Sequence, residues 1–407
     1  MAEDPAGLSP ARRRTLLALF AATVVYTVGE GSVQILLAPY LEQQGLTQAV
    51  IGRIVAFYSV VALAFRFITG SLYRPQRTVW LVPGGCVLQA VAFLLIVRTG
   101  DPLMLTLLFG LNGAGQALAS TGGLAAIMDV TDGRNAGSVM GWYTGFIGAG
   151  YGLAGFVGGY LGDQLGIASA IAALAAIPLV AGVALASGLR RVAAHSPEPA
   201  ASTRSGPGLA RVLEGLVAGF RHSGPLVWLA AAVALQINLV SGVLNTFFPL
   251  YGLAIGLTLT QVGALNGISS GVSSITRFVT PPVFRRVTPR SVLPYMVLLS
   301  GASVVGTTLS RALWALTLAW VLIGVSRGML RVSSAALVTE AARGPSRGAA
   351  SAIYMAGLDV GRIIGPILGG IGVEALGYER TFLTAGLVIP AVYFGLIWLI
   401  KRRHPDG

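Results

Sequence analysis

Long apolar runs, separated by short polar segments, recur along the whole chain of 407 residues. Each run is about 20 residues or longer, which as a helix is enough to cross the hydrocarbon core of a bilayer. Glycines, prolines and charged residues mark the ends of the runs. The pattern predicts twelve membrane-spanning helices, at residues 15–41, 47–72, 78–98, 103–129, 136–162, 166–190, 224–251, 257–284, 290–309, 312–340, 347–373 and 380–400.

One polar interruption, between the sixth and seventh expected spans, is longer than the others. Residues 194–208 are rich in Pro, Ser, Gly and Ala, a composition typical of a flexible linker. Residues 209–221 place apolar side chains at helical spacing among charged ones, which predicts a short amphipathic helix on the inner membrane face. We therefore expect an N-terminal six-helix bundle (1–190), a cytoplasmic linker with this helix (191–223) and a C-terminal six-helix bundle (224–407).

An internal repeat relates the two halves, because adding 211 to positions in the first half reaches matching residues in the second. The offset holds over about five spans without a gap. The matching pairs include Tyr40 and Tyr251, Arg66 and Arg277, Asp129 and Glu340, and Tyr143 and Tyr354. The repeat predicts that the two bundles arose by gene duplication and run in parallel.

The composition excludes a soluble protein, since 54% of the residues are hydrophobic and only 11% are charged. The net charge of +13 comes from arginines that gather in alternate loops, as the positive-inside rule requires, so it indicates no nucleic-acid partner. This asymmetry predicts cytoplasmic termini in a multi-pass protein, and the preference for arginine over lysine favours a bacterial cytoplasmic (inner) membrane. The single cysteine and the three histidines, which lie in polar segments, predict no metal site. No cofactor and no enzyme activity are expected, because the spans hold no paired His/Asp, Ser/Lys or metal-ligand residues.

Two short motifs carry a family resemblance. Residues 361–370 read G-R-I-I-G-P-I-L-G-G and resemble the G-x-x-x-G-P-x-x-G-G motif of the major facilitator superfamily, best known from span five of drug/proton antiporters. Here the complete copy lies in span eleven, and residues 150–159 in span five hold a degraded one. The loop at 70–77 resembles a shortened G-x-x-x-D-R-x-G-R signature without its acidic residue. The resemblance implies an all-α membrane protein with the major facilitator fold, which transports small molecules by alternating access.

Charged residues within the spans are the candidates for chemistry, because they are costly at membrane depth. Glu30, Arg327, Arg331, Asp359 and Arg362 have no charged counterpart at the repeat offset, so the shared frame does not require them. Three arginines against two acids favour a substrate with an anionic group, which arginine can bind bidentately. The alternative is that the four charges of the second half neutralise one another.

Glu30 is the main expected proton-coupling residue and Asp359 the second, since burial favours the protonated form of a carboxyl group. The alternatives for Glu30 are an ion pair with an arginine or direct contact with a cationic substrate. The expected substrate-binding residues are Glu30, Gln34, Asn112, Gln116, Asn238, Asn245, Arg327, Arg331 and Arg362. The expected gating or structural residues are Arg66, Asp129, Arg277, Glu340, Gly361, Gly365, Pro366, Gly369 and Gly370.

The chain is thus expected to be a monomeric secondary active transporter that moves a small molecule by alternating access, through proton-coupled efflux as an antiporter. Its expected partners are the substrate, protons and the lipid bilayer. Two alternatives remain at this point. One is a proton-linked importer of an organic anion or sugar, and the other is a membrane sensor that has the same fold and does not transport.

Overall fold

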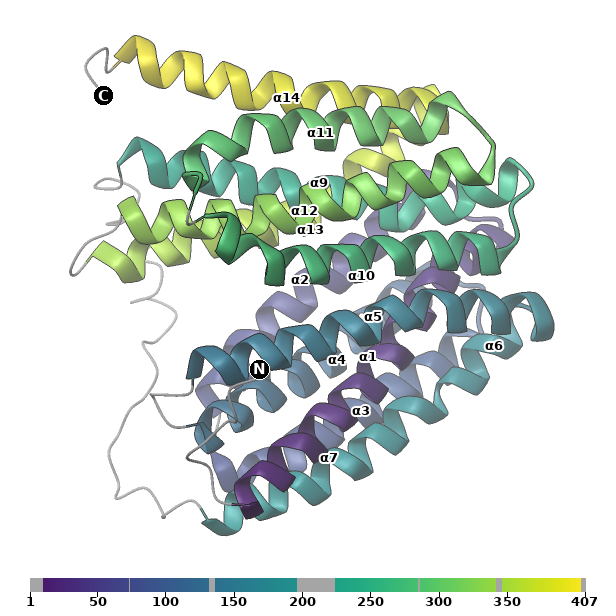
Figure 1. The fold of residues 1–407 in the computed structure, drawn as a ribbon. Helices are drawn as coiled ribbons and strands as arrows, with labels where there is room; N and C mark the ends of the chain where they lie inside the picture. The colour runs from purple at the N-terminus through teal and green to yellow at the C-terminus, as the bar shows by residue number, and fades with distance from the viewer. Residues whose placement is uncertain are drawn as a thin grey trace. The chain divides into compact units, whose positions relative to one another are not determined.

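The computed structural model describes residues 10–72, 74–131, 136–195, 224–284, 286–341 and 346–403, and within these ranges the regular structure is α-helical (Figure 1). The bounds are α1 Pro10–Gln43, α2 Gln48–Leu72, α3 Pro75–Ile96, α4 Pro102–Val130, α5 Ala136–Leu165, α6 Ile167–Leu174, α7 Ala176–His195, α9 Pro225–Ala254, α10 Leu259–Val283, α11 Pro289–Leu309, α12 Leu313–Ala341, α13 Ser346–Leu376 and α14 Tyr378–Arg403. Every predicted span overlaps one of these helices, and α6 and α7 together form the sixth. The prediction of an all-α membrane protein with twelve transmembrane helices is confirmed.

The sixth span is interrupted at Ala175, where α6 ends and α7 begins. Pro178 explains the break, because it has no N–H to donate to the carbonyl of Leu174 and its ring crowds that carbonyl. Within the described residues, ten spans are long and apolar enough to cross a membrane by length and composition alone. The glycine-rich α5 and the serine-rich and threonine-rich α10 are not among these ten.

The chain forms two compact units. The first contains Met1–Tyr40 and Phe57–Gly206, and the second contains Leu41–Ala56 and Pro207–Gly407. The end of α1 and the start of α2 therefore group with the second half of the chain. The division into bundles at 1–190 and 224–407 stays a prediction, and the expected amphipathic helix at 209–221 lies outside the described residues.

Backbone geometry repeats at the offset of 211 residues. Gly45 and Gly256 have φ angles of 77° and 90°, and Gly166 and Gly377 have φ angles of 79° and 80°. These four are the positive-φ residues of the described chain, and each pair is separated by 211 positions. Because residues with a Cβ atom rarely adopt this conformation, the same glycine turns connect equivalent helices in both halves.

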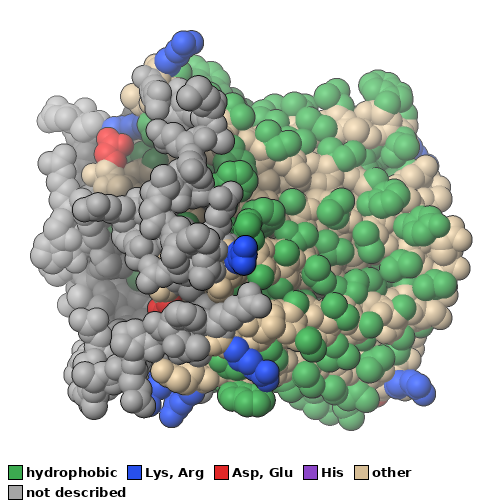
Figure 2. Space-filling view, turned by 60° about the horizontal axis from the view of Figure 1, so that its bottom comes forward, with side chains coloured by type: hydrophobic (Ala, Val, Ile, Leu, Met, Phe, Trp, Pro, Cys, Tyr) green, Lys and Arg blue, Asp and Glu red, His purple; other side chains and the backbone are tan. Residues whose placement is uncertain are grey.

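Large apolar side chains cover much of the molecular surface, and few charged side chains interrupt the apolar face in Figure 2. Trp80, Val183 and Trp314 are among the most exposed, each with more than 70% of its area accessible. In water such a surface would cause aggregation, whereas lipid chains satisfy it. The exposed apolar residues are therefore the lipid-facing surface of a membrane protein.

Candidate functional site

Glu30 of α1 is the centre of a hydrogen-bonded cluster inside the first unit. Its side chain is only 3% exposed. The hydroxyl of Tyr151 in α5 donates to Oε2 at 2.6 Å, and the hydroxyl of Tyr58 in α2 donates to Oε1 at 3.2 Å. The amide Nε2 of Gln34, one turn along α1, also donates to Oε1 at 2.9 Å. We call these four residues the Glu30 cluster.

The partners of Glu30 share a chemical property that suits proton exchange. A tyrosine hydroxyl can rotate from donor to acceptor, and a glutamine amide can turn to present its oxygen instead of its nitrogen. Glu30 can therefore be hydrogen-bonded to these groups both as a carboxylate and as a protonated acid. Because an unpaired buried polar group is costly, this adaptability lowers the cost of changing the protonation state at a buried position.

Sequence reasoning identified Glu30 and Gln34 but not the two tyrosines that complete the cluster. The contact from Tyr151 joins residues 121 positions apart, and the contact from Tyr58 joins residues 28 positions apart. Tyrosines occur at many places in the spans, where packing is their common role. The available signal was weak: both lie on helices of the same half as a buried acid, and each carries a hydroxyl at mid-span.

The second unit holds a cluster of arginines on three helices. Arg277 of α10 and Arg331 of α12 both lie close enough to Arg327 of α12 to repel it electrostatically. Arg331 also interacts electrostatically with Arg362 and Asp359 of α13. All five side chains are half-buried. The five side chains of this arginine cluster thus carry four guanidinium groups and one carboxylate, a net positive charge that favours an anion.

The arginine cluster is only partly satisfied by the protein. Arg327 Nη2 lies 3.5 Å from the hydroxyl of Ser270, at the limit of a hydrogen bond. In the described part of the chain, Nε of Arg277 is buried without a hydrogen-bond partner. Arginine offers five donors in a fixed plane and no acceptor, so a carboxylate or phosphate oxygen would fill the unmet positions.

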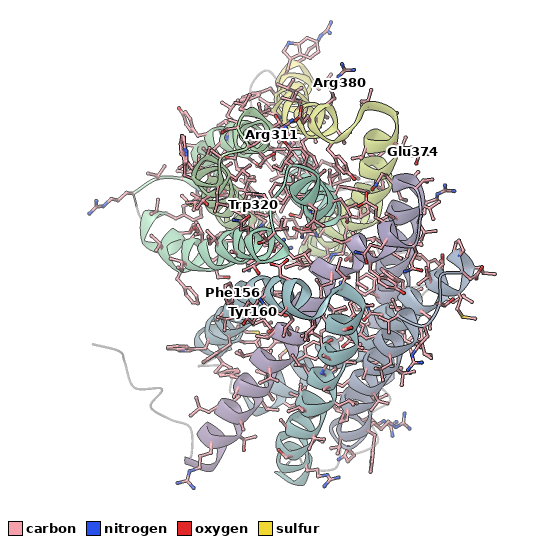
Figure 3. All side chains as sticks on the ribbon, turned by 90° about the vertical axis from the view of Figure 1, so that its right-hand side faces the viewer. Phe156, Tyr160, Arg311, Trp320, Glu374 and Arg380 are labelled. Atoms are coloured by element: carbon pink, nitrogen blue, oxygen red, sulfur yellow. The ribbon has the colours of Figure 1, made fainter. Side chains whose placement is uncertain are left out.

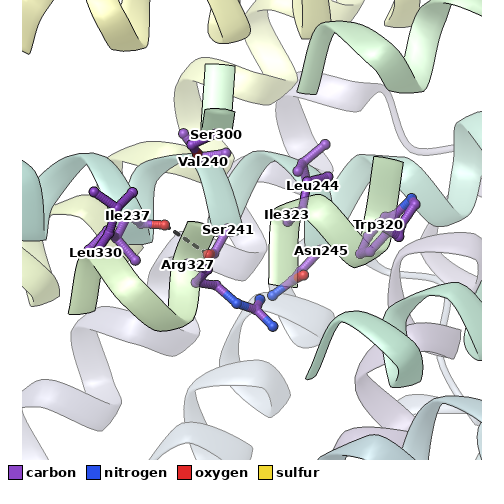
Figure 4. A pocket seen from close by; sticks show the side chains of 10 residues that line it. All are labelled: Ile237, Val240, Ser241, Leu244, Asn245, Ser300, Trp320, Ile323, Arg327 and Leu330. Carbon is purple, nitrogen blue, oxygen red and sulfur yellow. Dashed lines mark hydrogen bonds between the residues drawn. The ribbon is translucent and has the colours of Figure 1, made fainter. Parts of the chain in front are cut away.

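Arg327 borders a small cavity of about 20 Å³ between α9, α11 and α12 of the second unit (Figure 4). Ser241, Asn245 and Ser300 contribute polar groups to its lining, and the remaining lining side chains are apolar apart from the indole nitrogen of Trp320. Trp320 is buried, with 1% of its area exposed, and lies inside the helices of its unit (Figure 3). The lining is therefore mostly apolar with a few polar groups, and the space is about that of one water molecule.

Three other expected substrate-binding residues lie in helix interfaces or the interior. Asn112 Oδ1 accepts a hydrogen bond of 3.0 Å from Nε2 of the buried Gln89. Asn238 Nδ2 donates to the carbonyl of Leu358 at 2.8 Å, which ties α9 to α13. Gln116 is buried, and among the described residues its Oε1 has no hydrogen-bond partner. A contact between these residues and substrate stays a prediction.

The symmetric charged residues expected to act in gating lie in equivalent elements. Arg66 of α2 and Asp129 of α4 belong to the first unit, and Arg277 of α10 and Glu340 of α12 belong to the second. Both arginines are half-buried, and both acids are exposed. Their gating role stays a prediction.

The glycines at 361–370 bring α13 into backbone contact with its neighbours. A Cβ atom added at Gly365 would lie 2.5 Å from the carbonyl oxygen of Leu239, and one at Gly361 would meet that of Leu235. A Cβ atom at Gly369 would lie 2.8 Å from the ring of Phe247. These contacts join α13 to α9, so this part of the motif permits close helix packing.

The other end of the motif packs on the start of α2, within the second unit. Added Cβ atoms at Gly370 and Gly52 would meet the backbone carbonyls of Gln48 and Pro366, respectively. The backbone N–H of Ala49 also donates to the carboxylate of Glu374 at 2.9 Å. The motif therefore makes close contacts on two sides of α13.

Comparison with known proteins identifies the family. The Major Facilitator Superfamily model matches residues 19–312 and 285–407. The structure is similar to a bacterial homolog of the human lysosomal transporter Spinster, with a TM-score of 0.76, 14% identity and coverage of 97% of this chain and 98% of that one. It is also similar to the nucleoside transporter NupG, with a TM-score of 0.72, 16% identity and coverage of 94% and 99%. At these identities the likeness shows the fold alone.

A staphyloferrin B transporter of Staphylococcus aureus is 21% identical over 192 residues. The alignment spans 46% of this chain and 45% of that relative, so the chain matches less than half of its length. The family match covers nearly the whole sequence and agrees with the helical architecture. The protein is a multi-pass membrane protein and a secondary transporter of small molecules, not an enzyme. The chain belongs to the Major Facilitator Superfamily.

Proposed function

We propose that the protein is a proton-coupled exporter of a small molecule with an anionic group, and that Glu30 is its main proton site. The observation that carries the proposal is the Glu30 cluster, a carboxyl group 3% exposed and bound by two tyrosine hydroxyls and one amide. A buried acid whose partners can both donate and accept is suited to bind and release a proton during transport.

Burial and hydrogen bonding act on Glu30 in opposite directions. Removal from water disfavours the carboxylate, while donors at 2.6 Å, 2.9 Å and 3.2 Å stabilise it. A conformational change that alters these contacts would therefore change its proton affinity. In alternating access the binding region faces each side of the membrane in turn, so such a change can take up the proton on one side and release it on the other.

The arginine cluster supports the anionic nature of the substrate. The five residues hold four guanidinium groups and one carboxylate, that of Asp359, which acts on Arg331, so together they have a formal surplus of three positive charges. A bound carboxylate or phosphate would reduce the mutual repulsion of the guanidinium groups. Asp359, next to Arg331, is the second candidate for proton coupling.

Export is the preferred direction because the motif at 361–370 resembles that of drug/proton antiporters and because Glu30 is buried as an exchangeable acid. The surplus of arginine also suits a proton-linked importer of an organic anion. The two directions differ in which proton gradient drives accumulation. Inverted vesicles with an acidic interior accumulate substrate only if the protein exchanges it for protons, whereas an importer requires a right-side-out vesicle with an acidic exterior.

The decisive experiment compares the wild type with Glu30→Gln in such inverted vesicles. The vesicles receive a mixture of bacterial small molecules, and mass spectrometry identifies the compounds that accumulate only when the pH gradient is present. For any such compound, Glu30→Gln should lose gradient-driven accumulation and keep exchange of labelled for unlabelled substrate. Asp163→Asn removes an exposed carboxylate of the same unit and is the matched control.

Two further variants test the partners of Glu30. Tyr151→Phe should reduce coupled accumulation more than Tyr58→Phe, because the hydrogen bond from Tyr151 is 2.6 Å long and that from Tyr58 is 3.2 Å long. If Glu30→Gln accumulates substrate in response to the pH gradient as the wild type does, Glu30 is not the proton site and the proposal fails.

A further inference from the structure

The internal repeat places the cavity of the second unit at the same helix positions as the Glu30 cluster of the first. Residue pairs related by the offset of 211 lie in α1 and α9, in α3 and α11, and in α4 and α12. The pairs are Tyr26 and Ile237, Glu30 and Ser241, Gln34 and Asn245, Gln89 and Ser300, Asn112 and Ile323, and Gln116 and Arg327. The region around Glu30 in the first unit and the cavity in the second unit are therefore equivalent positions of the internal repeat.

The region around Glu30 in the first unit holds large polar side chains. Tyr26, Glu30, Gln89 and Asn112 are all buried, and Gln89 donates to Asn112 at 3.0 Å. In the second unit the counterparts of the three longest are shorter, since isoleucine replaces tyrosine and serine replaces glutamate and glutamine. The cavity of about 20 Å³ lies at these positions of the second unit, where the side chains are smaller. In the second unit Ser241 replaces the acid Glu30, and Arg327 lies at the edge of the cavity.

Two hydrogen-bond donors meet at that edge. Asn245 Oδ1 accepts from Nδ2 of Asn266 at 3.5 Å, which leaves Nδ2 of Asn245 on the side of the Arg327 guanidinium (Figure 4). Among the described residues, Arg327 has no carboxylate within ion-pair distance, and its hydrogen-bond contact is the hydroxyl of Ser270 at 3.5 Å. A cationic and a neutral donor thus lie side by side without an acceptor, an arrangement that an anion would satisfy.

The surroundings strengthen the attraction for an anion. Arg277 and Arg331 repel Arg327, so a bound negative charge would reduce the repulsion among all three. The walls next to Arg327 are apolar, and Coulomb interactions are stronger in a medium of low dielectric constant. The cavity has room for about one water molecule, so it can receive one oxygen of an end group that is held by the donors at its edge, but not a whole substrate. A planar carboxylate matches the edge of a guanidinium and needs fewer donors than a phosphate.

We infer that this cavity is the subsite for a carboxylate of the transported molecule, and that Arg327 and Asn245 bind its two oxygens. The inference rests on the proposed transport function and deepens it by naming the substrate class and the recognition residues. Arg331 and Arg362, next to Asp359, set the potential around the subsite. The substrate therefore carries at least one carboxylate group that is small and unhindered.

The test measures binding without any gradient. The melting temperature of the purified full-length chain in detergent is followed with sodium succinate, with sodium phosphate and with choline chloride at matched ionic strength. Succinate should raise the melting temperature saturably, as expected when a ligand binds the folded state, and choline chloride should not. Loss of a charge-assisted hydrogen bond corresponds to a fall in affinity of roughly tenfold or more, so Arg327→Gln should weaken succinate binding by at least that factor.

Matched variants keep the test interpretable. Arg327→Lys retains the charge without the planar fork and should bind succinate with intermediate affinity. Ser300→Val fills the cavity without changing charge, and should reduce binding without lowering the melting temperature of the free protein. Arg290→Gln removes an exposed arginine of the same unit and should bind as the wild type does.

Two outcomes overturn the inference. One is that succinate does not stabilise the wild type, or stabilises Arg327→Gln equally, and the other is that phosphate binds as tightly as succinate. Glu30→Gln should still show a saturable rise in melting temperature with succinate, which separates the two proposals. Loss of binding in Arg327→Gln together with normal proton coupling in Glu30→Gln would refute the proton site alone. Wild-type succinate binding in Arg327→Gln together with lost proton coupling in Glu30→Gln would refute the carboxylate subsite alone.

Discussion

Gly365→Ala tests the physical role of the motif at 361–370. The added Cβ atom would lie 2.5 Å from the carbonyl oxygen of Leu239, 3.0 Å from its Cα atom and 3.1 Å from its carbonyl carbon. Ordinary contact begins at 3.4 Å, so the closest approach is 0.9 Å too short. All three atoms belong to the backbone of α9 and cannot turn aside as a side chain would. Helices α9 and α13 must therefore move apart.

The cost follows from this overlap. Overpacking a close contact costs about 1–3 kcal/mol, and the better helix propensity of alanine offsets up to about 1 kcal/mol. A net loss of about 1–2 kcal/mol in a unit of roughly 200 residues should lower the melting temperature by about 2–8 °C. Thermal unfolding of the full-length protein in detergent measures the change.

Gly271→Ala is the matched control, because it lies in α10 of the same unit and an added Cβ atom would meet nothing within 4 Å. Its melting temperature should equal or exceed that of the wild type, since alanine stabilises an unhindered helix by up to about 1 kcal/mol. Equal melting temperatures for Gly365→Ala and Gly271→Ala would show that the close approach of the two helices is not what requires glycine, and the packing argument would then be wrong.

Three other variants have defined outcomes. Asn112→Leu should destabilise the protein by about 1–3 kcal/mol, because it leaves the buried amide of Gln89 unpaired, and a second change of Gln89 to Leu should restore part of the loss in thermal unfolding. Arg311→Gln should change stability by less than about 1 kcal/mol, since its 3.3 Å ion pair with Glu379 joins side chains that are 70% and 48% exposed. Asn238→Ala should lower the melting temperature, because its amide donates at 2.8 Å to a carbonyl of α13, and an unchanged succinate affinity would place the residue outside the subsite. A several-fold loss of succinate affinity there would instead assign Asn238 to the subsite.

The helices could be predicted from sequence because a bilayer imposes a simple rule. A backbone surrounded by lipid must satisfy its own hydrogen bonds, and about 20 apolar residues in a helix do so across the hydrocarbon core. The break at Ala175 could not be predicted from Pro178 alone. Pro83, Pro249 and Pro366 lie inside uninterrupted helices, so a proline in a span does not by itself determine where a helix ends.

The candidate site was predictable in part. Glu30 and Arg327 stand out because a charge in a span is rare and neither has a charged counterpart at the repeat offset. Their partners do not stand out, because hydrogen bonds such as that from Tyr151 depend on the rotation of each helix and on contacts between distant positions. The cavity beside Arg327 was also beyond sequence reasoning, since it is lined by several residues on three helices.

The duplication gives a physical reason for pairing a proton site with a carboxylate site. Equivalent positions hold Glu30 and Tyr151 in one half and Ser241 and Arg362 in the other, so an acid and its phenol donor correspond to a serine and an arginine. These positions lie on equivalent helices of the two halves, and each substitution changes the local charge without a new fold. Protonation of Glu30 and binding of the carboxylate can favour different conformations of the transport cycle. Thermodynamic linkage then requires protonation to change the affinity of the protein for the carboxylate, and the bound carboxylate to change its affinity for the proton. Succinate affinity should then depend on pH in the wild type and lose part of that dependence in Glu30→Gln.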